Sequence, residues 1–493
     1  MLEAKQTESL GSVCILGAGK TGLVVARYLC THFDRVSKLT LYTGNPKSSV
    51  SPDLALLTQQ GLTIIESDHL TEDYDVCIAS PGIPPYSPLY ISACKHCREV
   101  IGEPEFAWRC RPQRWVAITG TNGKTTTTTL IEHMIRADHK QACAVGNIGR
   151  ACLGEVDHHL ADTWFVAELS SFQLAETKLL HPHAAILLNI TPDHIEWHGS
   201  MQAYAAAKER IFANLTTDDL AIISRDDPYC KAIYSRLVER GLSPVCVDTS
   251  QDPKTLQAAY CSDSMLYVRL NGTTTPLIKA SEAALKGMHN IQNMLAASAL
   301  ALFIGVSVDA IRQVLQTFTT LEHRLEYVAT IHGVSFVNDS KATNTDSVEK
   351  ALTAFPCGST IVLLGGHDKQ TDLSSLVHQV VRKCRGAICF GEAGQRIYHE
   401  LVSVQNAQAS NGEGACDKCY NAVASAPLSF VKCVPHLRDA FDCAVTHAKP
   451  HTTVLLSPAC SSFDEFHNME ERGTYFKKLV HELRATSDDE KLS

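Results

Sequence analysis

The sequence predicts an α/β protein of three domains, in which short and mostly parallel strands alternate with helices. Apolar, β-rich runs of four or five residues alternate with helical stretches along most of the 493-residue chain. At roughly 150 residues per domain, this length corresponds to about three domains. Two of the strand-like runs also lead directly into glycine-rich turns that open a helix, which is typical of parallel α/β layers.

The predicted strands fall into three groups. The first comprises residues 13–16, 38–42 and 76–79; the second 115–119, 164–167, 185–189 and 220–223; the third 335–338, 360–364, 387–390 and 453–456. We therefore predict domains of residues 1–111, 112–320 and 321–493. The first and third are expected to be Rossmann-like and the central one to resemble a P-loop ATPase. Residues 404–426 are predicted to form a polar surface insertion, and the charged tail from Ala485 is expected to fray.

Composition excludes several other classes. Apolar residues make up 45% and charged residues 20%, unlike collagen, coiled coils or disordered chains. No apolar run reaches the roughly 20 residues needed to span a bilayer, and the charged residues Glu3, Lys5 and Glu8 argue against a signal peptide. The net charge of −9 argues against a general nucleic-acid binder. We expect a cytoplasmic monomer whose partners are small molecules, with no nucleic acid and no membrane.

Nineteen cysteines are expected to be reduced. Two C-x-x-C pairs, Cys94/Cys97 and Cys416/Cys419, lie far apart in the sequence, and the first is expected to fall inside a helix. A zinc site needs four ligands at close spacing. We therefore interpret the cysteines, including the strand residue Cys14, as small buried hydrophobes.

The first glycine loop, Gly17-Ala-Gly-Lys-Thr-Gly22, follows a strand and opens a helix. Such a loop lets backbone N–H groups approach a pyrophosphate at a helix N-terminus. NAD binding would call for an acidic residue near the end of the second strand, where Tyr42, Thr43 and Gly44 stand. NAD binding and a turn without ligand stay open, but we favour a site for a nucleotide-diphosphate group of the substrate.

The second glycine loop lies in Val116-Ala-Ile-Thr-Gly-Thr-Asn-Gly-Lys-Thr-Thr126. Lys124 is placed to reach the β- and γ-phosphates of a nucleotide, and Thr125 offers a hydroxyl to Mg²⁺. Packing gives no reason for glycine, lysine and threonine at this spacing. The predicted nucleotide-binding residues here are Gly120, Thr121, Asn122, Gly123, Lys124, Thr125 and Thr126.

Polar side chains follow two further predicted strands. Glu168 comes directly after the run 164–167, and His194 comes shortly after the run 186–188. Ligands of open parallel sheets bind outside the carboxyl ends of the strands. We therefore expect Glu168 and His194 to meet the second glycine loop and to hold divalent metal together with Thr125.

The G-x-x-G-K-T-T form of this loop resembles that of the Mur ligase and folylpolyglutamate synthetase superfamily. Three more segments resemble the Mur ligases: Tyr204-Ala-Ala-Ala-Lys208, Gly287-Met-His-Asn-Ile-Gln-Asn-Met-Leu-Ala-Ala297 and Glu322-His-Arg-Leu-Glu326. The resemblance implies that Lys208 is carbamylated and helps to hold a second Mg²⁺. It further implies that Asn290 and Asn293 lie near the nucleotide. Arg324 is suited to the charge of the transferring γ-phosphate.

The segments Asn338-Asp-Ser-Lys-Ala-Thr-Asn344, Leu456-Ser-Pro-Ala-Cys-Ser-Ser-Phe-Asp-Glu-Phe466 and Ser80-Pro-Gly-Ile83 resemble the branch of the family that adds D-glutamate. Through this resemblance Asp339 would contact ATP. The residues implied to hold the incoming amino acid are Lys341, Thr343, Lys369, Ser462 and Phe463. Those implied to face the muramoyl-alanine are Asn147, Gln173 and His194. Those implied to face the uridine diphosphate are Lys20, Thr21 and Thr43. Ser80, Pro81 and Gly82 are implied to bind the substrate as well.

The resemblance implies an ATP-dependent amide ligase of peptidoglycan synthesis, which adds D-glutamate to UDP-N-acetylmuramoyl-L-alanine through an acyl phosphate. ATP and two Mg²⁺ ions are the implied cofactors. The residues expected to act in catalysis are Lys124, His194, Lys208 and Arg324. Two alternatives stay open: a sister ligase or folylpolyglutamate synthetase-like enzyme with another amino acid, and a nucleotide-regulated binding protein without catalysis.

Overall fold

The computed structural model describes residues 9–44, 52–318, 322–368, 370–411 and 428–489. The chain separates into two compact units, Met1–Phe318 and Thr319–Ser493, here called unit 1 and unit 2. Unit 1 carries two β-sheets and unit 2 carries one. The predicted α/β class with three parallel-rich sheets is therefore confirmed, whereas the boundary near residue 111 stays a prediction.

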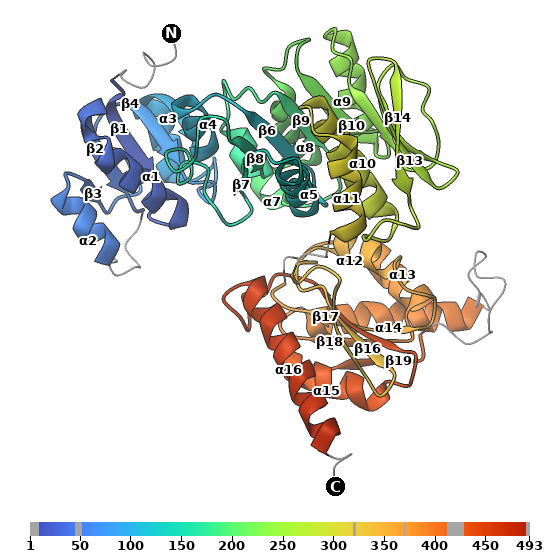
Figure 1. The fold of residues 1–493 in the computed structure, drawn as a ribbon. Helices are drawn as coiled ribbons and strands as arrows, with labels where there is room; N and C mark the ends of the chain where they lie inside the picture. The colour runs from blue at the N-terminus through green and yellow to red at the C-terminus, as the bar shows by residue number, and fades with distance from the viewer. Residues whose placement is uncertain (1–8, 45–51, 319–321, 369, 412–427, 490–493) are drawn as a thin grey trace. The chain divides into compact units, whose positions relative to one another are not determined.

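The first sheet of unit 1 is built from parallel strands in the order β3-β2-β1-β4-β5. The strands are β1 (Gly11–Leu16), β2 (Val36–Tyr42), β3 (Thr63–Ile65), β4 (Tyr74–Ala79) and β5 (Cys97–Gly102), and the helices are α1 (Lys20–Thr31), η2 (Phe33–Arg35), α2 (Pro52–Gln59), α3 (Pro88–His96) and α4 (Glu103–Cys110) (Figure 1). The strand order reverses between β1 and β4, which makes this the position where an open sheet binds ligands. The loops beginning at Gly17 and Ser80 leave the sheet at that position.

The second sheet has the order β14-β13-β12-β11-β10-β9-β6-β8-β7, with antiparallel pairing only within β12-β13-β14 among its described strands. Its strands are β6 (Trp115–Thr119), β7 (Ala142–Gly146), β8 (Trp164–Glu168), β9 (Ala184–Leu187), β10 (Leu220–Ser224), β11 (Val245–Asp248), β12 (Ala258–Ser262), β13 (Met265–Leu270) and β14 (Thr273–Lys279). Its helices are α5 (Lys124–Ala137), α6 (Ser171–Ala175), α7 (Ile195–His198), α8 (Met201–Glu209), η3 (Arg210–Phe212), α9 (Pro228–Glu239), α10 (Met288–Phe303) and α11 (Val308–Thr317). Strand β6 lies between β8 and β9, so the loops that follow these three strands lie at one edge.

A continuous hydrophobic core joins the two sheets of unit 1. Val13 of β1 and Trp115 of β6 belong to the same cluster of buried side chains. The buried carboxylate of Glu105 on α4 accepts hydrogen bonds from the backbone N–H groups of Lys178, Leu179 and Leu180 at 2.9–3.1 Å. This carboxylate therefore fixes the first sheet's last helix against the loop that leads into β9.

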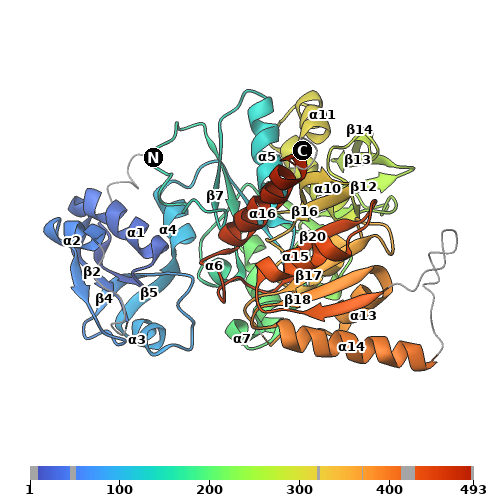
Figure 2. The same cartoon turned by 90° about the horizontal axis from the view of Figure 1, so that it is seen from below.

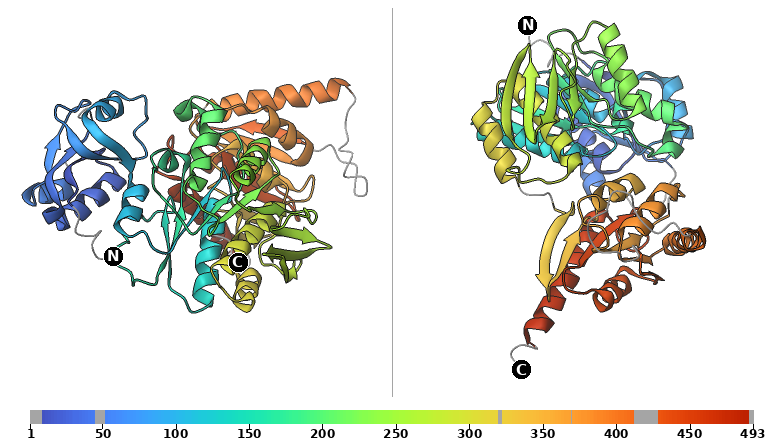
Figure 3. Two further views of the ribbon diagram at one scale, coloured as in Figure 1. Left: turned by 90° about the horizontal axis from the view of Figure 1, so that it is seen from above. Right: turned by 90° about the vertical axis from the view of Figure 1, so that its right-hand side faces the viewer.

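Unit 2 contains one sheet of order β15-β16-β20-β17-β18-β19, in which only the β15–β16 pair is antiparallel within the described part of the unit. Its strands are β15 (Glu326–Ile331), β16 (Val334–Asn338), β17 (Thr360–Gly365), β18 (Gly386–Phe390), β19 (Phe430–Cys433) and β20 (Thr453–Ala459), and its helices are α12 (Thr345–Leu352), α13 (Ser374–Lys383), α14 (Gly394–Asn411), α15 (Leu437–His447) and α16 (Met469–Asp489). Side chains of α12, α13 and α14 pack in one core cluster, and those of α15 and α16 in another. The sheet is thus covered on both faces, as Figure 2 and Figure 3 show from further sides.

The strands predicted from the sequence are confirmed, with ends that shift by at most three residues. Three local predictions were wrong. Cys94 lies on α3 but Cys97 opens β5, so the C-x-x-C pair is not inside one helix. Residues 404–411 continue α14, while the remainder of the predicted insertion, residues 412–426 with Cys416 and Cys419, lies outside the described residues. The tail from Ala485 continues α16 to Asp489 instead of fraying there.

Candidate active site

The second glycine loop lies between β6 and α5, as the sequence predicts. Gly123 has a φ of 85° and precedes the first turn of α5. A Cβ atom at this position would lie 2.3 Å from Oδ1 of Asn293, so packing as well as backbone conformation requires glycine here. The expectation that packing gives no reason for this glycine was therefore wrong. No described side chain caps the N-terminus of this 14-residue helix. Its first N–H groups and the positive end of its dipole are therefore suited to a phosphate.

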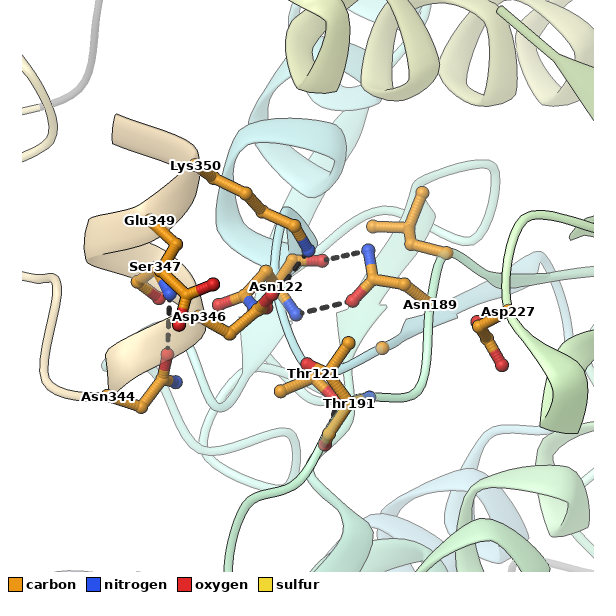
Figure 4. A network of polar contacts seen from close by, with 12 residues as sticks. Thr121, Asn122, Asn189, Thr191, Asp227, Asn344, Asp346, Ser347, Glu349 and Lys350 are labelled. Atoms are coloured by element: carbon orange, nitrogen blue, oxygen red, sulfur yellow. Dashed lines mark hydrogen bonds and ion pairs between the residues drawn. The ribbon is translucent and has the colours of Figure 1, made fainter. Parts of the chain in front are cut away.

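Hydrogen bonds hold the glycine loop to the loop that follows β9 (Figure 4). The Asn122 N–H donates to Oδ1 of Asn189 at 2.9 Å, and the Asn189 amide donates back to the Asn122 carbonyl at 3.2 Å. The Thr191 N–H donates to the Thr121 hydroxyl at 3.0 Å. That hydroxyl also lies 3.0 Å from the Tyr204 hydroxyl. These bonds fix the loop before any ligand arrives.

Two lysine amines converge on one carbonyl of this loop. Lys124 Nζ donates to the carbonyls of Gly120 and Thr121, each at 2.8 Å. Lys208 Nζ on α8 donates to the same Gly120 carbonyl, also at 2.8 Å. Only 1% of Lys208 is exposed, and burial together with the charge of Lys124 holds the pKa of Lys208 well below its usual value. The Lys208 amine is thus favoured in its neutral, nucleophilic form.

Glu168 ends β8 with its side chain almost fully buried. Its Oε1 accepts a hydrogen bond from the Asn147 amide at 3.1 Å, whereas Oε2 has no hydrogen-bond partner among the described residues. Such a buried carboxylate oxygen is a costly arrangement unless a cation or another donor completes it. Glu168 is also among the charges that act on Lys208. These features fit a divalent cation, which prefers oxygen ligands.

His194 lies at the start of α7 with a φ of 53°. Its ring packs edge-on against Phe172, with ring centroids 4.7 Å apart, and its Nε2 lies 3.5 Å from Oδ2 of Asp193. Burial, with contributions from His194 and Lys208, lowers the pKa of His198 to about 4. The sequence analysis missed Asp193 and His198 as members of this polar group, although both stand in the segment that follows β9.

The remaining predicted residues of this part of unit 1 are engaged in local structure. Thr125 and Thr126 lie buried in the first turn of α5. The Asn290 amide donates to the Lys286 carbonyl at 2.8 Å, and the Asn293 amide donates to Oδ1 of Asn290 at 3.3 Å. Because Asn293 also contacts Gly123, the second turn of α10 lies against the glycine loop.

The first glycine loop has a packing role that the sequence did not reveal. A Cβ atom at Gly22 would lie 1.9 Å from the Gly17 carbonyl oxygen, so α1 can begin this close to the loop only with glycine there. Lys20 Nζ donates to the Gly149 carbonyl at 2.7 Å, and the Ser80 N–H donates to the Leu16 carbonyl at 3.1 Å. Thr21 lies in the first turn of α1, Pro81 and Gly82 lie on the loop after β4, and Thr43 follows β2.

Gln173 occupies a helix cap. Its side-chain oxygen accepts a hydrogen bond from the Ser170 N–H at 2.9 Å, while the Ser170 hydroxyl accepts from the Gln173 N–H at 3.2 Å. This reciprocal pair is a capping box at the start of α6. The contact predicted between Gln173 and the muramoyl-alanine stays a prediction.

In unit 2, the loop after β16 carries a buried carboxyl group. Asp339 accepts hydrogen bonds from the Ser457 hydroxyl at 2.7 Å and from the Leu325 N–H at 3.1 Å. Burial raises the pKa of Asp339 to about 7 against the opposing influence of these donors and of Arg324. Arg324 is therefore close enough to act on the Asp339 carboxyl group, while the role of both residues with ATP stays a prediction.

The residues predicted to hold the amino acid lie on the loops after β16 and β20. The Lys341 N–H donates to the His323 carbonyl at 3.0 Å, and the Thr343 N–H donates to the Lys341 carbonyl at 2.9 Å. Ser462 is buried, whereas 70% of Phe463 is exposed. Lys369 lies outside the described residues.

Arg472 of α16 joins these two loops, and the sequence analysis missed it. Its fully buried guanidinium donates to the hydroxyl and the carbonyl of Ser340 and to the carbonyls of Cys460 and Ser461, at 2.9–3.1 Å. A signal was available in the sequence. Arg472 is in helical phase with the apolar residues Phe476, Leu479 and Val480, so the period of 3.6 residues places it on the buried face.

Comparisons with known proteins identify two family models in the chain. Residues 118–301 match the Mur ligase middle domain, and residues 323–460 match the Mur ligase glutamate ligase domain. The UDP-N-acetylmuramoylalanine–D-glutamate ligase of Acidobacterium capsulatum is 38% identical over 473 residues, covering 95% of each chain. The ligase of the same name from Geobacillus kaustophilus is 34% identical over 476 residues, covering 96% of this chain and 98% of its own.

Solved structures agree on the fold. The UDP-N-acetylmuramate-alanine ligase MurC of Thermotoga maritima aligns with a TM-score of 0.55 at 17% identity, over 96% of this chain and 99% of its own. MurF of Acinetobacter baumannii aligns with a TM-score of 0.56 at 15% identity, over 94% and 93%. Throughout the described ranges, every helix is too short or too polar to span a membrane.

Proposed function

The chain belongs to the Mur ligase family, and on this basis we propose that it uses ATP to join D-glutamate to UDP-N-acetylmuramoyl-L-alanine. The reaction is an amide ligation of peptidoglycan synthesis, and it places the protein in the cytoplasm with small molecules as its partners. Relatives with this activity in their names match nearly the whole chain at 33–38% identity. The observation in the structure that supports the chemistry is the convergence of Lys124 and Lys208 on the Gly120 carbonyl, with Glu168 among the charges acting on Lys208.

ATP and Mg²⁺ fit the residues of unit 1. The phosphates of ATP would lie at the N-terminus of α5, where Lys124 provides a countercharge and Thr125 a hydroxyl. Glu168, with its available oxygen, and His194 would hold Mg²⁺ together with Thr125. Bound Mg²⁺ would neutralise the charge that develops on the phosphate oxygens during transfer.

Lys208 would complete this arrangement after modification. Its neutral amine attacks CO₂, forms an N–C bond and releases a proton, so that a buried neutral amine becomes a carbamate anion. An ammonium next to Lys124 and a divalent cation would be repelled, whereas the carbamate attracts both. The low pKa of Lys208 supports this proposal because only the neutral amine reacts.

The proposed ligation proceeds in two chemical steps. The alanyl carboxylate attacks the γ-phosphorus, the bond to the ADP oxygen breaks, and an acyl phosphate forms. The amine of D-glutamate attacks the acyl carbon to give a tetrahedral intermediate, which collapses with loss of phosphate and of the amine proton. In unit 2, Arg324 and Asp339 would serve ATP. Lys341 and Lys369 would pair with the two carboxylates of D-glutamate.

The test measures phosphate release with UDP-N-acetylmuramoyl-L-alanine and a panel of amino acids. We expect turnover with D-glutamate and little with L-alanine, L-lysine or meso-diaminopimelate. L-Alanine lacks the second carboxylate that the two lysines would pair with, and the cationic side chains of the other two would face lysines in a desolvated pocket. Faster release with L-lysine would favour a sister ligase, and release only with a folate acceptor would favour a folylpolyglutamate synthetase. Nucleotide binding without release under any condition would favour a binding protein.

A further inference from the structure

Three cysteines that are far apart in the sequence meet in the first sheet. Cys14 and Cys77 are direct partners in the parallel pair of β1 and β4, so their side chains leave the sheet on the same face. Cys97 opens the neighbouring strand β5 directly after α3. The three Sγ atoms all lie within 4.8 Å of one another, and those of Cys14 and Cys97 are 3.6 Å apart.

We propose that Cys14, Cys77 and Cys97 form a three-coordinate binding site for a soft, thiophilic metal ion of the Cu(I) type. Thiolate ligands select such ions, whereas structural zinc is almost always four-coordinate. The described residues include one other compact triad, Cys143, Glu155 and His159, but its mixed ligands suit harder ions. The proposal concerns binding alone and does not depend on the ligase activity.

The surroundings supply both a thiolate and an entry path. Hydrogen bonds from the thiols of Cys14 and Cys77 lower the pKa of Cys97, whereas burial holds that of Cys77 well above its usual value. Cys97 is the partly exposed member of the triad, and it lines a surface groove of about 290 Å³ together with Cys94. An ion can therefore meet a thiolate at the surface first, and each further thiol loses its proton as it coordinates.

If the three thiols served only as small apolar groups, their sulfur atoms would need no mutual contact. Cys94 provides the matched comparison. It belongs to the same C-x-x-C pair and lines the same groove, but it is exposed on α3 and is not part of the triad. The proposal therefore makes Cys97 a metal ligand and excludes Cys94, which stands three positions away.

The test titrates the reduced full-length chain anaerobically with Cu(I) presented by a chromophoric chelator. The wild-type chain should withdraw one more equivalent of Cu(I) from the chelator than the Cys97→Ser variant does. The affinity of that equivalent should fall more than about 100-fold in the variant, because even outer partners of metal ligands change affinity about 10- to 100-fold. Cys94→Ser and Cys143→Ala should behave as wild type. Equal uptake by Cys97→Ser, or loss of the equivalent in either control, would overturn the proposal.

A second measurement needs no variant. Alkylation of the native chain, mapped by mass spectrometry, should show that Cu(I) protects Cys97 from iodoacetamide while Cys94 stays reactive. Equal labelling of Cys97 with and without Cu(I) would contradict the site. The same titration with Zn(II) is expected to show weaker binding; tight Zn(II) binding that requires Cys94 would replace the three-coordinate assignment by a four-coordinate one.

Discussion

Replacing Arg472 by methionine should loosen the loops after β16 and β20 without affecting unit 1. The change removes the hydrogen-bond donor of three buried carbonyls, those of Ser340, Cys460 and Ser461. Each buried carbonyl left without a donor costs about 1–3 kcal/mol of stability, or roughly 6 kcal/mol in all. It also removes the cost of burying the guanidinium. Burial lowers the pKa of Arg472 from 12.5 to about 10, which corresponds to about 3 kcal/mol. We therefore expect the free energy of unfolding of unit 2 to fall by about 3 kcal/mol.

The chain offers a way to measure the two units separately. All four tryptophans lie in unit 1: Trp108, Trp115, Trp164 and Trp197. The unfolding transition followed by tryptophan fluorescence should therefore have the same midpoint in Arg472→Met as in the wild-type chain. Hydrogen exchange in β16 and β20 should accelerate about 100-fold, since each 1.4 kcal/mol is a factor of ten.

The proposed role of these loops predicts a kinetic effect as well. The KM for D-glutamate should rise, while the KM for the uridine substrate stays unchanged. The matched control is Arg438→Met, which removes exposed ion pairs to Asp442 and Glu482 and should cost less than about 1 kcal/mol. If Arg472→Met and Arg438→Met showed the same exchange rates and the same KM for D-glutamate, the inference that Arg472 holds these two loops in place for D-glutamate would fail.

Three further predictions address single charges. Lys124→Ala should keep the fold but lower turnover by roughly 3–4 kcal/mol in activation free energy, as for loss of one preorganised donor; near-normal phosphate release by the folded variant would refute this. Lys208→Ala should lose activity and regain part of it with acetate, whereas Lys208→Arg should not, because its guanidinium stays cationic. A bare amine at Lys208 in an active crystal would contradict the carbamate. The folded pKa of Asp339, about 7, exceeds its usual 3.8, so the folded state binds more protons between these values and the stability of unit 2 should fall as pH rises through this range, by up to about 4 kcal/mol. Denaturant unfolding of Asp339→Asn should show a flatter pH profile.

Local sequence patterns were sufficient to predict the strands. They were also sufficient to predict which polar residues follow the carboxyl ends of these strands. Trp115–Thr119 reads as a strand from its apolar run, and the glycines and Lys124 that follow indicate a phosphate-binding loop. The position of Glu168 after β8 follows from the same pattern. In each case neighbouring residues carry the information, so one segment of sequence is enough.

The predictions failed where structure depends on pairing between distant segments. No spacing in the sequence shows that Cys97 meets Cys14 and Cys77, because the order of β1, β4 and β5 decides it. The C-x-x-C pair directed attention to Cys94, which is a sequence neighbour of Cys97 but not a member of the triad. Likewise, the contact of Lys208 with the Gly120 carbonyl spans 88 positions and was not predicted. Only the resemblance to a family pointed to Lys208 as a site residue.

Helix α8 explains why the glycine loop and Lys208 behave as one structural group. Tyr204 and Lys208 are four residues apart on this helix, so both side chains lie on the same face. The first meets the Thr121 hydroxyl at 3.0 Å and the second donates to the Gly120 carbonyl at 2.8 Å. A shift of the helix would therefore displace the phosphate-binding loop and the buried amine together. Because the amine is held at the loop by the same helix that orients the loop, a carbamate formed on Lys208 would arise beside the position proposed for the phosphates of ATP.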